Sequence, residues 1–373
     1  MIEKIEVPDT VSLPKGSRAC RRKADELRAA HQLHRKIVSF AEGKSDLPRN
    51  QPLPGQHKLF DEDELSEKKL WASELTGDTH KALSRAFDKL EAGGPWRNVA
   101  KAPPPTVLDP LHQDFPNFDG VTRLIQQRLV LNRLAQEKPI SLPPILLNGP
   151  AGVGKTAYCQ RLAGLLGLRF EKIDLSSATT NFSLTGLDAG YNNGNPGRIW
   201  ASLQHDNISV LWLLDEVDKV ERGHKDGGNN HLLGLLEPVS SKRFVDNCTL
   251  LAIDASWICY IATSNYKAQI DAPLLSRFEV FDIQAPDPQQ VQAIVRSIYR
   301  DIRESEAWGP CFSHELDDSV ICALSALTPR EIRRRLFDAF AAAAEQARPC
   351  LLASDIKVAH GNEENTQRRI GFI

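Results

Sequence analysis

The residues with the clearest chemical meaning in this chain form a glycine-rich loop that ends in a lysine and a threonine. The loop matches the phosphate-binding pattern G-x-x-x-x-G-K-[ST] at every fixed position. Its residues are Gly149, Pro150, Ala151, Gly152, Val153, Gly154, Lys155 and Thr156. An apolar run precedes it and a potential helix follows, which is the setting that the motif requires. Glycines let backbone N–H groups surround nucleotide phosphates, and the helix start adds partial positive charge. We expect Lys155 to reach the β- and γ-phosphates and the Thr156 hydroxyl to bind Mg²⁺.

A pair of carboxylates follows a second apolar run, Val210–Leu214. Asp215 stands where a Walker B aspartate would hold the Mg²⁺ shell. Glu216 comes next, beyond the expected strand end, and is a candidate to orient and deprotonate an attacking water. Such a pair downstream of a phosphate loop favours hydrolysis over binding alone.

Two further candidates are less specific on their own. Asn265 follows the apolar run that ends near Ala262, and it either contributes to the site or simply caps the strand. Arg277 follows an apolar turn and is a candidate to stabilise γ-phosphate charge across a subunit boundary. The alternative for Arg277 is a surface salt bridge, which contributes little energy.

The elements that would position these residues alternate between strand and helix from about 108 to 285. Apolar strand candidates lie at Ile145–Leu147, Phe170–Ile173, Val210–Leu214, Trp257–Ala262 and Phe278–Ile283. Strands that alternate with helices indicate a mostly parallel sheet covered on both faces. From Pro288 onward the pattern is helical, and the strongest helices are expected at Gln289–Glu304 and Arg330–Arg348.

Residues 1–105 differ from the rest of the chain. The segment Lys15–Lys44 holds nine Lys or Arg against three Asp or Glu, and helices are expected over Arg21–Ala41 and near Glu64–Ala92. The triple proline at 103–105 is typical of a linker. The basic segment either contacts nucleic acid or an acidic partner, or is a solvated helix face.

Composition narrows the classes of protein. The chain has 373 residues, of which 41% are hydrophobic and 25% charged, with a net charge of −2. This is typical of a soluble protein of two or three domains. No run of 18 apolar residues and no signal-peptide pattern is found, so no membrane association is expected. The seven cysteines form no C-x-x-C pair, which makes a disulfide framework or a metal cluster improbable and favours the cytoplasm.

With these motifs in place, the chain resembles an AAA+ ATPase, and most of all the ATPase module of the Lon proteases, from about Asp114 to Asp355. The resemblance implies an α/β P-loop NTPase (AAA+) sheet covered by helices, a small helical lid and a helical N-terminal extension. The implied domains are 1–105 (extension and linker), 106–285 (nucleotide-binding domain), 286–360 (lid) and 361–373 (polar tail). It also implies ATP and Mg²⁺ as ligands.

The resemblance assigns roles to single residues. Asn265 corresponds to the first sensor and Arg277 to the arginine finger. The segment Thr328–Glu331 resembles the second sensor, with Arg330 reaching the γ-phosphate and Arg333 as the alternative.

Lon-specific features lie around Tyr191, where Gly190 to Ile199 resembles the substrate-gripping loop of Lon. One extra residue separates Tyr191 from Gly194, so Tyr191 either grips a substrate or is an ordinary aromatic in a loop rich in Gly and Asn. Further matches are Asp215–Val220, Leu232–Pro238 and Pro273–Val280. The short stretch after Arg330 leaves no room for Lon's Ser-Lys peptidase domain, and residues 1–105 do not resemble Lon's N-terminal region. The resemblance therefore implies a motor without peptidase activity of its own.

The resemblance thus implies a cytoplasmic ATPase that assembles with copies of itself into a hexameric ring and remodels a protein substrate. A separate peptidase or adaptor is a further expected kind of partner. Two alternatives stay open. One is a DNA-associated AAA+ motor or loader that uses the basic N-terminal segment. The other is a slow ATP-dependent switch that recruits a partner.

Overall fold

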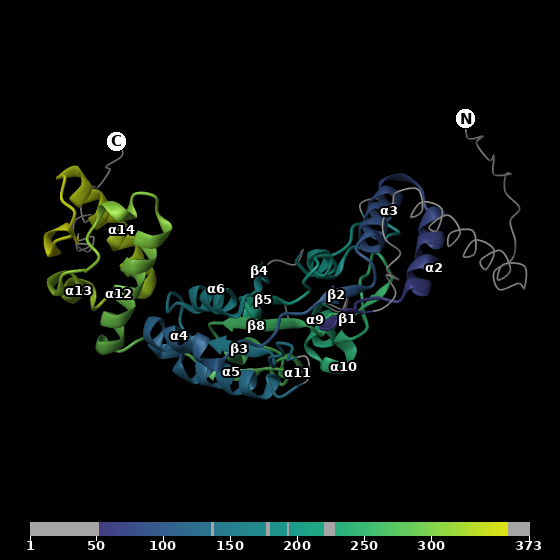
Figure 1. Cartoon of the computed structure of the whole chain (residues 1–373), viewed down its shortest axis with the longest axis horizontal. Coiled ribbons are helices and arrows are strands. Elements are labelled where there is room, and N and C mark those ends of the chain that lie inside the picture. The colour runs from purple at the N-terminus through teal and green to yellow at the C-terminus, as the bar shows by residue number, and fades with distance from the viewer. Residues whose placement is uncertain (1–51, 136–137, 177–179, 192–193, 220–227, 357–373) are drawn as a thin grey trace, which may run out of the picture. The chain divides into compact units, whose positions relative to one another are not determined.

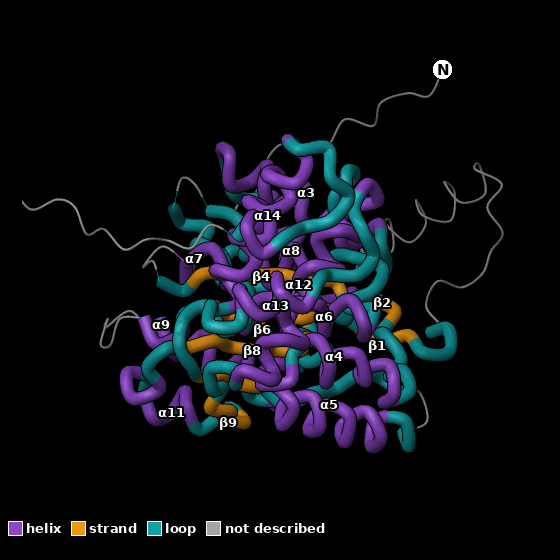
Figure 2. The backbone as a smooth tube through the Cα atoms, turned by 90° about the vertical axis from the view of Figure 1, so that its left-hand side faces the viewer, coloured by secondary structure: helices purple, strands orange, loops and turns teal. Residues whose placement is uncertain are grey.

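Five short apolar runs form the central sheet of the protein, seen in a computed structural model that describes residues 52–135, 138–176, 180–191, 194–219 and 228–356. The strands are β3 (Ile145–Asn148), β4 (Arg169–Asp174), β5 (Val210–Asp215), β8 (Ile258–Ser264) and β9 (Glu279–Asp282). They are parallel and lie in the order β4-β5-β8-β3-β9 (Figures 1 and 2). The predicted strands and the parallel α/β fold are confirmed.

The register of the sheet aligns the carboxyl ends of its strands. Asp174 of β4 pairs with Asp215 of β5, and Asn148 of β3 pairs with Ser264 of β8. Parallel strands bind ligands beyond this edge. The polar residues that follow β3, β5 and β8 in the sequence are therefore brought together here.

The two faces of the sheet have separate apolar cores, because successive strand side chains point to opposite faces. Leu211 and Leu213 of β5 belong to the core that includes α5 (Asp119–Asn132) and α6 (Lys155–Leu166). Val210, Trp212 and Leu214 of β5 belong to the other core, with α8 (Arg198–Ser202) and α9 (Gly228–Leu236). The continuous apolar run of β5 is thus explained by burial on both faces.

The described part of the predicted N-terminal extension packs into the second of these cores. Helices α2 (Glu62–Ser73) and α3 (Gly77–Ala92) follow strand β1 (Gln56–Lys58) in the chain and precede strand β2 (Trp96–Asn98). The two strands pair with each other. The described residues 52–356 all lie in one unit. The predicted helical stretch near 64–92 is two helices.

The reason for this packing is an apolar stripe on α3. Leu83, Phe87 and Leu90 recur at helical spacing and are buried in the same core as Trp212. Phe87 also meets the Trp200 ring edge-on, with 6.2 Å between the ring centroids. The predicted helix over 21–41 and the basic segment at 15–44 lie outside the described residues.

The C-terminal helices lie together (Figure 1) and share an apolar core of their own. They are α12 (Pro288–Ser305), α13 (Asp318–Leu324) and α14 (Pro329–Glu345). Capping boxes start two of them: Asp287 with Gln290 before α12, and Thr328 with Glu331 before α14. Both predicted C-terminal helices are present, although α14 ends at Glu345.

The remaining elements are short: α4 (Asp109–Asp114), α7 (Thr180–Thr185), α10 (Pro238–Ser241), α11 (Ala272–Leu275), β6 (Phe244–Val245) and β7 (Ala252–Ile253). Within the described residues, no helix is both long enough and apolar enough to cross a membrane.

Candidate active site

The glycine-rich loop connects β3 to α6, as the sequence predicts. Gly152 and Gly154 adopt φ values of 84° and 104°, which side-chain-bearing residues rarely reach. Gly149 packs against the carbonyl oxygen of Ile283, where an added Cβ would collide. Three of the loop's positions therefore require glycine for physical reasons. Such a turn at the start of a helix can present backbone N–H groups to an anion.

Lys155 begins α6, and its side chain bends back over the loop. Its Nζ donates hydrogen bonds to the carbonyl oxygen of Gly149, to that of Pro150 at 3.1 Å and to Oδ1 of Asn265 at 3.1 Å. Burial lowers the pKa of Lys155, and nearby carboxylates, Asp215 first, oppose this. The lysine and the predicted sensor asparagine thus meet directly.

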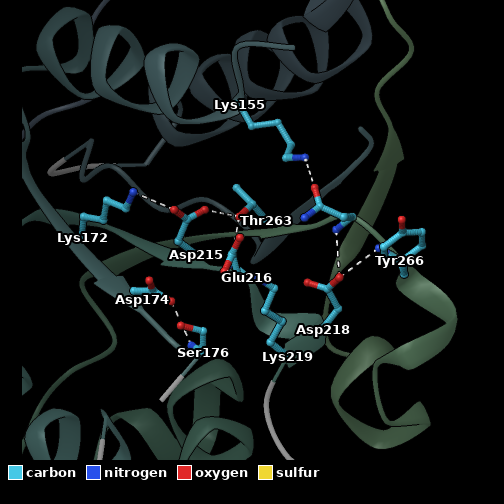
Figure 3. Close-up of polar contacts among 11 residues, drawn as sticks. Lys155, Lys172, Asp174, Ser176, Asp215, Glu216, Asp218, Lys219, Thr263 and Tyr266 are labelled. Carbon is cyan, nitrogen blue, oxygen red and sulfur yellow. Dashed lines mark hydrogen bonds and ion pairs between the residues drawn. The ribbon is translucent and has the colours of Figure 1, made fainter. Parts of the chain in front are cut away.

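Asp215 is the last residue of β5, and two side chains hold its carboxylate (Figure 3). One oxygen accepts a hydrogen bond from the Thr263 hydroxyl. The other lies 2.6 Å from Nζ of Lys172, which comes from the neighbouring strand β4. The carboxylate is therefore fixed at the sheet edge beside Lys155.

Glu216 has an unusual backbone for its residue type. Its φ is 58°, in the left-handed region that costs a non-glycine residue about 1 kcal/mol or more. Its N–H donates to Oγ1 of Thr263 at 3.1 Å, and its carboxylate lies 2.6 Å from Nζ of Lys219. Strain of this kind gathers at functional sites. The turn that carries Glu216 is thus held in place by Thr263 of β8.

Asp218 is a buried carboxylate that organises the turn after β8 (Figure 3). Its Oδ2 accepts hydrogen bonds from the N–H groups of Asn265 and Tyr266, both at 3.0 Å. Its Oδ1 has no hydrogen-bond partner among the described residues. Asn265 therefore does more than cap a strand, because Asp218 fixes its backbone and Lys155 contacts its side chain.

A cavity of about 320 Å³ collects most of the predicted residues. Its apolar wall includes Phe115 and two residues of α12, Ile294 and Ile298. Of the predicted site residues, it is lined by Ala151, Gly152, Val153, Gly154, Lys155, Thr156, Asp215, Glu216, Asn265 and Arg330.

Arg330 reaches this cavity from the first turn of α14. A Cβ added to Gly152 would lie 3.7 Å from Cβ of Arg330, so the helix start abuts the glycine-rich loop. Arg333 lines the same cavity. Both arginines predicted as alternatives for the second sensor are therefore placed within the site.

Four predicted residues do not line this cavity: Gly149 and Pro150, at the start of the glycine-rich loop, and Arg277 and Tyr191, which lie elsewhere. Arg277 is exposed, follows α11 and is not among the residues that line the cavity. Its charge helps to lower the pKa of Glu237, after the larger effect of hydrogen bonds from Ser240. Tyr191 is 64% exposed in a loop before α8 and is also outside the cavity.

The residues present suit Mg²⁺ held together with phosphate oxygens. Thr156 and Asp215 offer a hydroxyl and a carboxylate to the same cavity. Among the described residues, no cluster of three or more His, Cys, Asp or Glu side chains forms a metal site. Mg²⁺ prefers oxygen ligands and commonly binds through one or two protein groups plus phosphates.

Sequence reasoning missed four contributors: Lys172, Asp218, Lys219 and Thr263. Asp218 and Lys219 stand beside the carboxylate pair in the chain, but nothing in the pattern indicates their partners. Thr263 had a usable signal. A hydroxyl two residues before Asn265 faces the same side of β8 as Asn265 would in an extended strand.

The fold and the cavity define a P-loop nucleotide-binding domain. Residues 145–284 match the family described as "ATPase family associated with various cellular activities (AAA)". The chain is also similar to Lon proteases over its ATPase region, as the sequence predicts.

Three relatives illustrate this similarity. The Lon protease of Nitrosococcus oceani is 31% identical over 229 residues, covering 60% of this chain and 29% of the relative. The peroxisomal Lon protease homolog 2 of Zea mays is 30% identical over 212 residues, covering 56% and 24%. The Lon protease of Porphyromonas gingivalis is 34% identical over 162 residues, covering 43% and 19%. The chain therefore spans less than a third of the length of these relatives.

Among solved structures, a RuvB mutant of Thermotoga maritima is similar with a TM-score of 0.42 and 14% identity, covering 62% of this chain and 67% of that chain.

Proposed function

We propose that this protein hydrolyses ATP with Mg²⁺ and couples the reaction to remodelling of a polypeptide. One observation carries the proposal: Lys155, Asp215, Glu216, Asn265 and Arg330 come from four separate segments and line one cavity. A cavity used only for binding has no need of a carboxylate beyond the strand end.

In this mechanism Lys155 and the loop N–H groups hold the β- and γ-phosphates. Thr156 and Asp215 would hold Mg²⁺, which neutralises charge on the phosphate oxygens. Water attacks the γ-phosphorus while the bond to the β-γ bridging oxygen breaks, and ADP leaves. Glu216 accepts the proton of that water and Asn265 orients it.

Two arginines complete the proposal. Arg330 of α14 contacts the γ-phosphate within the same chain, with Arg333 as the alternative. Arg277, exposed and outside its own cavity, enters the cavity of a neighbouring copy. Loss of the γ-phosphate then shifts the C-terminal helices against the sheet and moves the loop of Tyr191, which pulls the polypeptide. A ring of copies, hexameric by the Lon resemblance, is part of this proposal.

The first test is the steady-state ATPase rate of the wild type and of Glu216→Gln, with an unfolded protein and then DNA added. Glu304→Gln is the matched control, because Glu304 is exposed on α12 and lies outside the cavity. We expect Glu216→Gln to lose 10²–10⁴-fold in turnover, the usual contribution of a general base. We also expect unfolded protein, and not DNA, to stimulate the wild type. Stimulation by DNA alone would replace this proposal with a nucleic-acid motor.

The second test asks whether Arg277 acts across a boundary between copies. Arg277→Ala and Lys155→Ala should each be inactive alone, since an arginine finger contributes 10³–10⁵ in rate. Random 1:1 mixing would restore roughly one quarter of wild-type turnover, because one site in four pairs an intact Lys155 with an intact neighbouring Arg277. An inactive mixture would refute the action of Arg277 across subunits.

A further inference from the structure

The loop that carries Tyr191 is tightly closed at its base. We call residues 186–191 and 194–197 the Tyr191 loop. Gly186 has a φ of 88°, and an added Cβ there would lie 2.7 Å from the carboxylate of Asp246. Gly197 packs against the backbone of Leu184 and Gly186, where an added Cβ would collide. The two ends of the loop are therefore in contact, backbone to backbone.

A buried carboxylate fastens one end of the loop. Asp246 is fully buried and accepts hydrogen bonds from three N–H groups: Gly197 at 2.7 Å, Cys248 at 2.9 Å and Thr249 at 3.1 Å. A carboxylate that accepts several backbone N–H bonds is a strong anchor. Breaking the bond to Gly197 would leave a buried charge with one donor fewer, which is unfavourable.

Asn247, the next residue, holds the other end of the loop, at Thr185 and Gly186. The N–H of Asn247 donates to the carbonyl oxygen of Thr185 at 2.8 Å. Its side-chain amide donates to Oγ1 of Thr185 at 3.1 Å and to the carbonyl oxygen of Gly186 at 3.2 Å. Asp246 and Asn247 together therefore hold both ends of the Tyr191 loop.

Helix α3 of the N-terminal region contacts the loop near its tip. The hydroxyl of Thr79, which is 5% exposed, donates to the carbonyl oxygen of Tyr191 at 3.1 Å. A Cβ added to Gly194 would lie 3.2 Å from Cγ2 of Thr79, so α3 also packs on the second half of the loop, which begins at Gly194. The tyrosine itself stays 64% exposed.

The same N-terminal region supports the segment that carries Asp246. Strands β6 and β7 flank that segment, and the N–H of Ala252 in β7 donates to Oε1 of Glu64 in α2 at 3.1 Å. The N–H of Asp254 donates to the carbonyl oxygen of Leu59 at 2.8 Å. Residues 52–98 thus touch both the tip of the loop and the support of its base.

From these contacts we infer that Thr79, Asp246 and Asn247 are positioning residues that hold the Tyr191 loop as a rigid arm for an unfolded polypeptide. The α2–α3 region is then part of the substrate-handling apparatus. This inference rests on the proposed function, because the arm needs a polypeptide to act on. An exposed aromatic on a braced loop offers contact area at little cost in conformational entropy.

The test of the brace uses hydrogen–deuterium exchange on the full chain. Thr79→Val keeps the volume of the side chain and removes the hydroxyl. Thr76→Val is the matched control, since Thr76 is exposed and its side chain makes no capping hydrogen bond. We expect loop amides to exchange about fivefold faster in Thr79→Val, the loss of one neutral hydrogen bond. Exchange equal to that of Thr76→Val would overturn the brace.

A second experiment tests the substrate role of the loop. It measures the concentration of an unfolded, reduced and alkylated protein that gives half-maximal ATPase stimulation. We expect it to rise in Thr79→Val and in Asn247→Asp, whose carboxylate would face the Gly186 carbonyl. A general structural defect would instead lower unstimulated turnover as well. Faster exchange with unchanged stimulation would overturn the substrate role. A wild type that unfolded protein does not stimulate would refute the proposed function and leave the exchange result standing.

Discussion

The buried carboxylate of Asp218 supports the site by holding the backbone of Asn265, and its charge also opposes the lowering of the pKa of Lys155 by burial. Its Oδ2 accepts two backbone hydrogen bonds at 3.0 Å, from Asn265 and from Tyr266. Hydrogen bonds to a charged group contribute roughly 1.5–3 kcal/mol each. Asp218→Ala removes both acceptors.

The expected cost is smaller than the sum of the two bonds. Tyr266 is 67% exposed, so its N–H can turn to water in the variant. Only the N–H of Asn265, which is partly buried, then stays unpaired. Loss of a buried charge also recovers some desolvation energy. We therefore expect Asp218→Ala to lower the free energy of unfolding by about 3 kcal/mol, and Asp218→Asn by about 1–2 kcal/mol, because the amide oxygen still accepts.

The assay pairs urea unfolding with turnover and nucleotide binding. Displacement of Asn265 should lower turnover by roughly tenfold or more while the affinity for a fluorescent ATP analogue changes little. Asp317→Ala is the control, because Asp317 also accepts a backbone N–H, from Ser319, but starts α13 away from the cavity. If Asp218→Ala matches that control in stability and turnover, the positioning role of Asp218 is refuted.

Three more predictions test other charges of the structure. Lys172→Met removes a cation 2.6 Å from the carboxylate of Asp215. Titration of nucleotide binding should then need about fivefold less Mg²⁺, since one competing charge is gone, and an unchanged requirement would contradict the pairing. Burial raises the pKa of Asp246 from 3.8 to about 6, so the folded state binds this proton more tightly than the unfolded state. The stabilisation from this proton is complete below about pH 4 and lost by about pH 6. The free energy of unfolding of the wild type relative to Asp246→Asn, measured in urea, should therefore decline by about 3 kcal/mol over that window. Parallel pH profiles of the two proteins would contradict this. Arg300→Met breaks the ion pair of α12 with Asp114, whose side chain is 5% exposed while that of Arg300 is 47% exposed. Because solvent screens the exposed Arg300, the free energy of unfolding should fall by only about 1–2 kcal/mol. Nucleotide binding, measured by calorimetry, should also weaken. Wild-type values in both measurements would show that Arg300 does not link α12 to the cavity.

The sequence was sufficient for the strands of the sheet and for ten of the residues that line the cavity. Local sequence carries both kinds of information, because continuous apolar runs and the glycine-rich loop are each encoded within a few residues. β5 was predicted at Val210–Leu214 and runs from Val210 to Asp215. Asp215 was assigned to the site because it follows an apolar run, as a Walker B aspartate does.

The contacts between distant segments could not be predicted from the sequence. Lys172 and Asp215 meet because β4 and β5 are neighbours, and strand order is not encoded locally. The packing of α3 was missed for a similar reason. Its apolar stripe at Leu83, Phe87 and Leu90 indicates that some surface covers it, but the pattern does not say which. The prolines at 103–105 suggested a linker, although the chain continues there into packed structure at Ala102 and Leu108.

A short stretch of chain joins the end of β4, which lies beside Asp215, to the Tyr191 loop. The N–H of Leu175 donates to the carbonyl oxygen of Asp215 at 3.0 Å, which ties the end of β4 to the end of β5. From there the chain reaches Thr185, the residue that Asn247 holds at the base of the loop. We expect a shift of Asp215 against β4 to reach the base of the loop, because the chain leads from Leu175 to Thr185. Because Asp246 and Asn247 do not line the cavity, variants there should separate the two processes: nucleotide binding is retained, and its effect on the loop is lost.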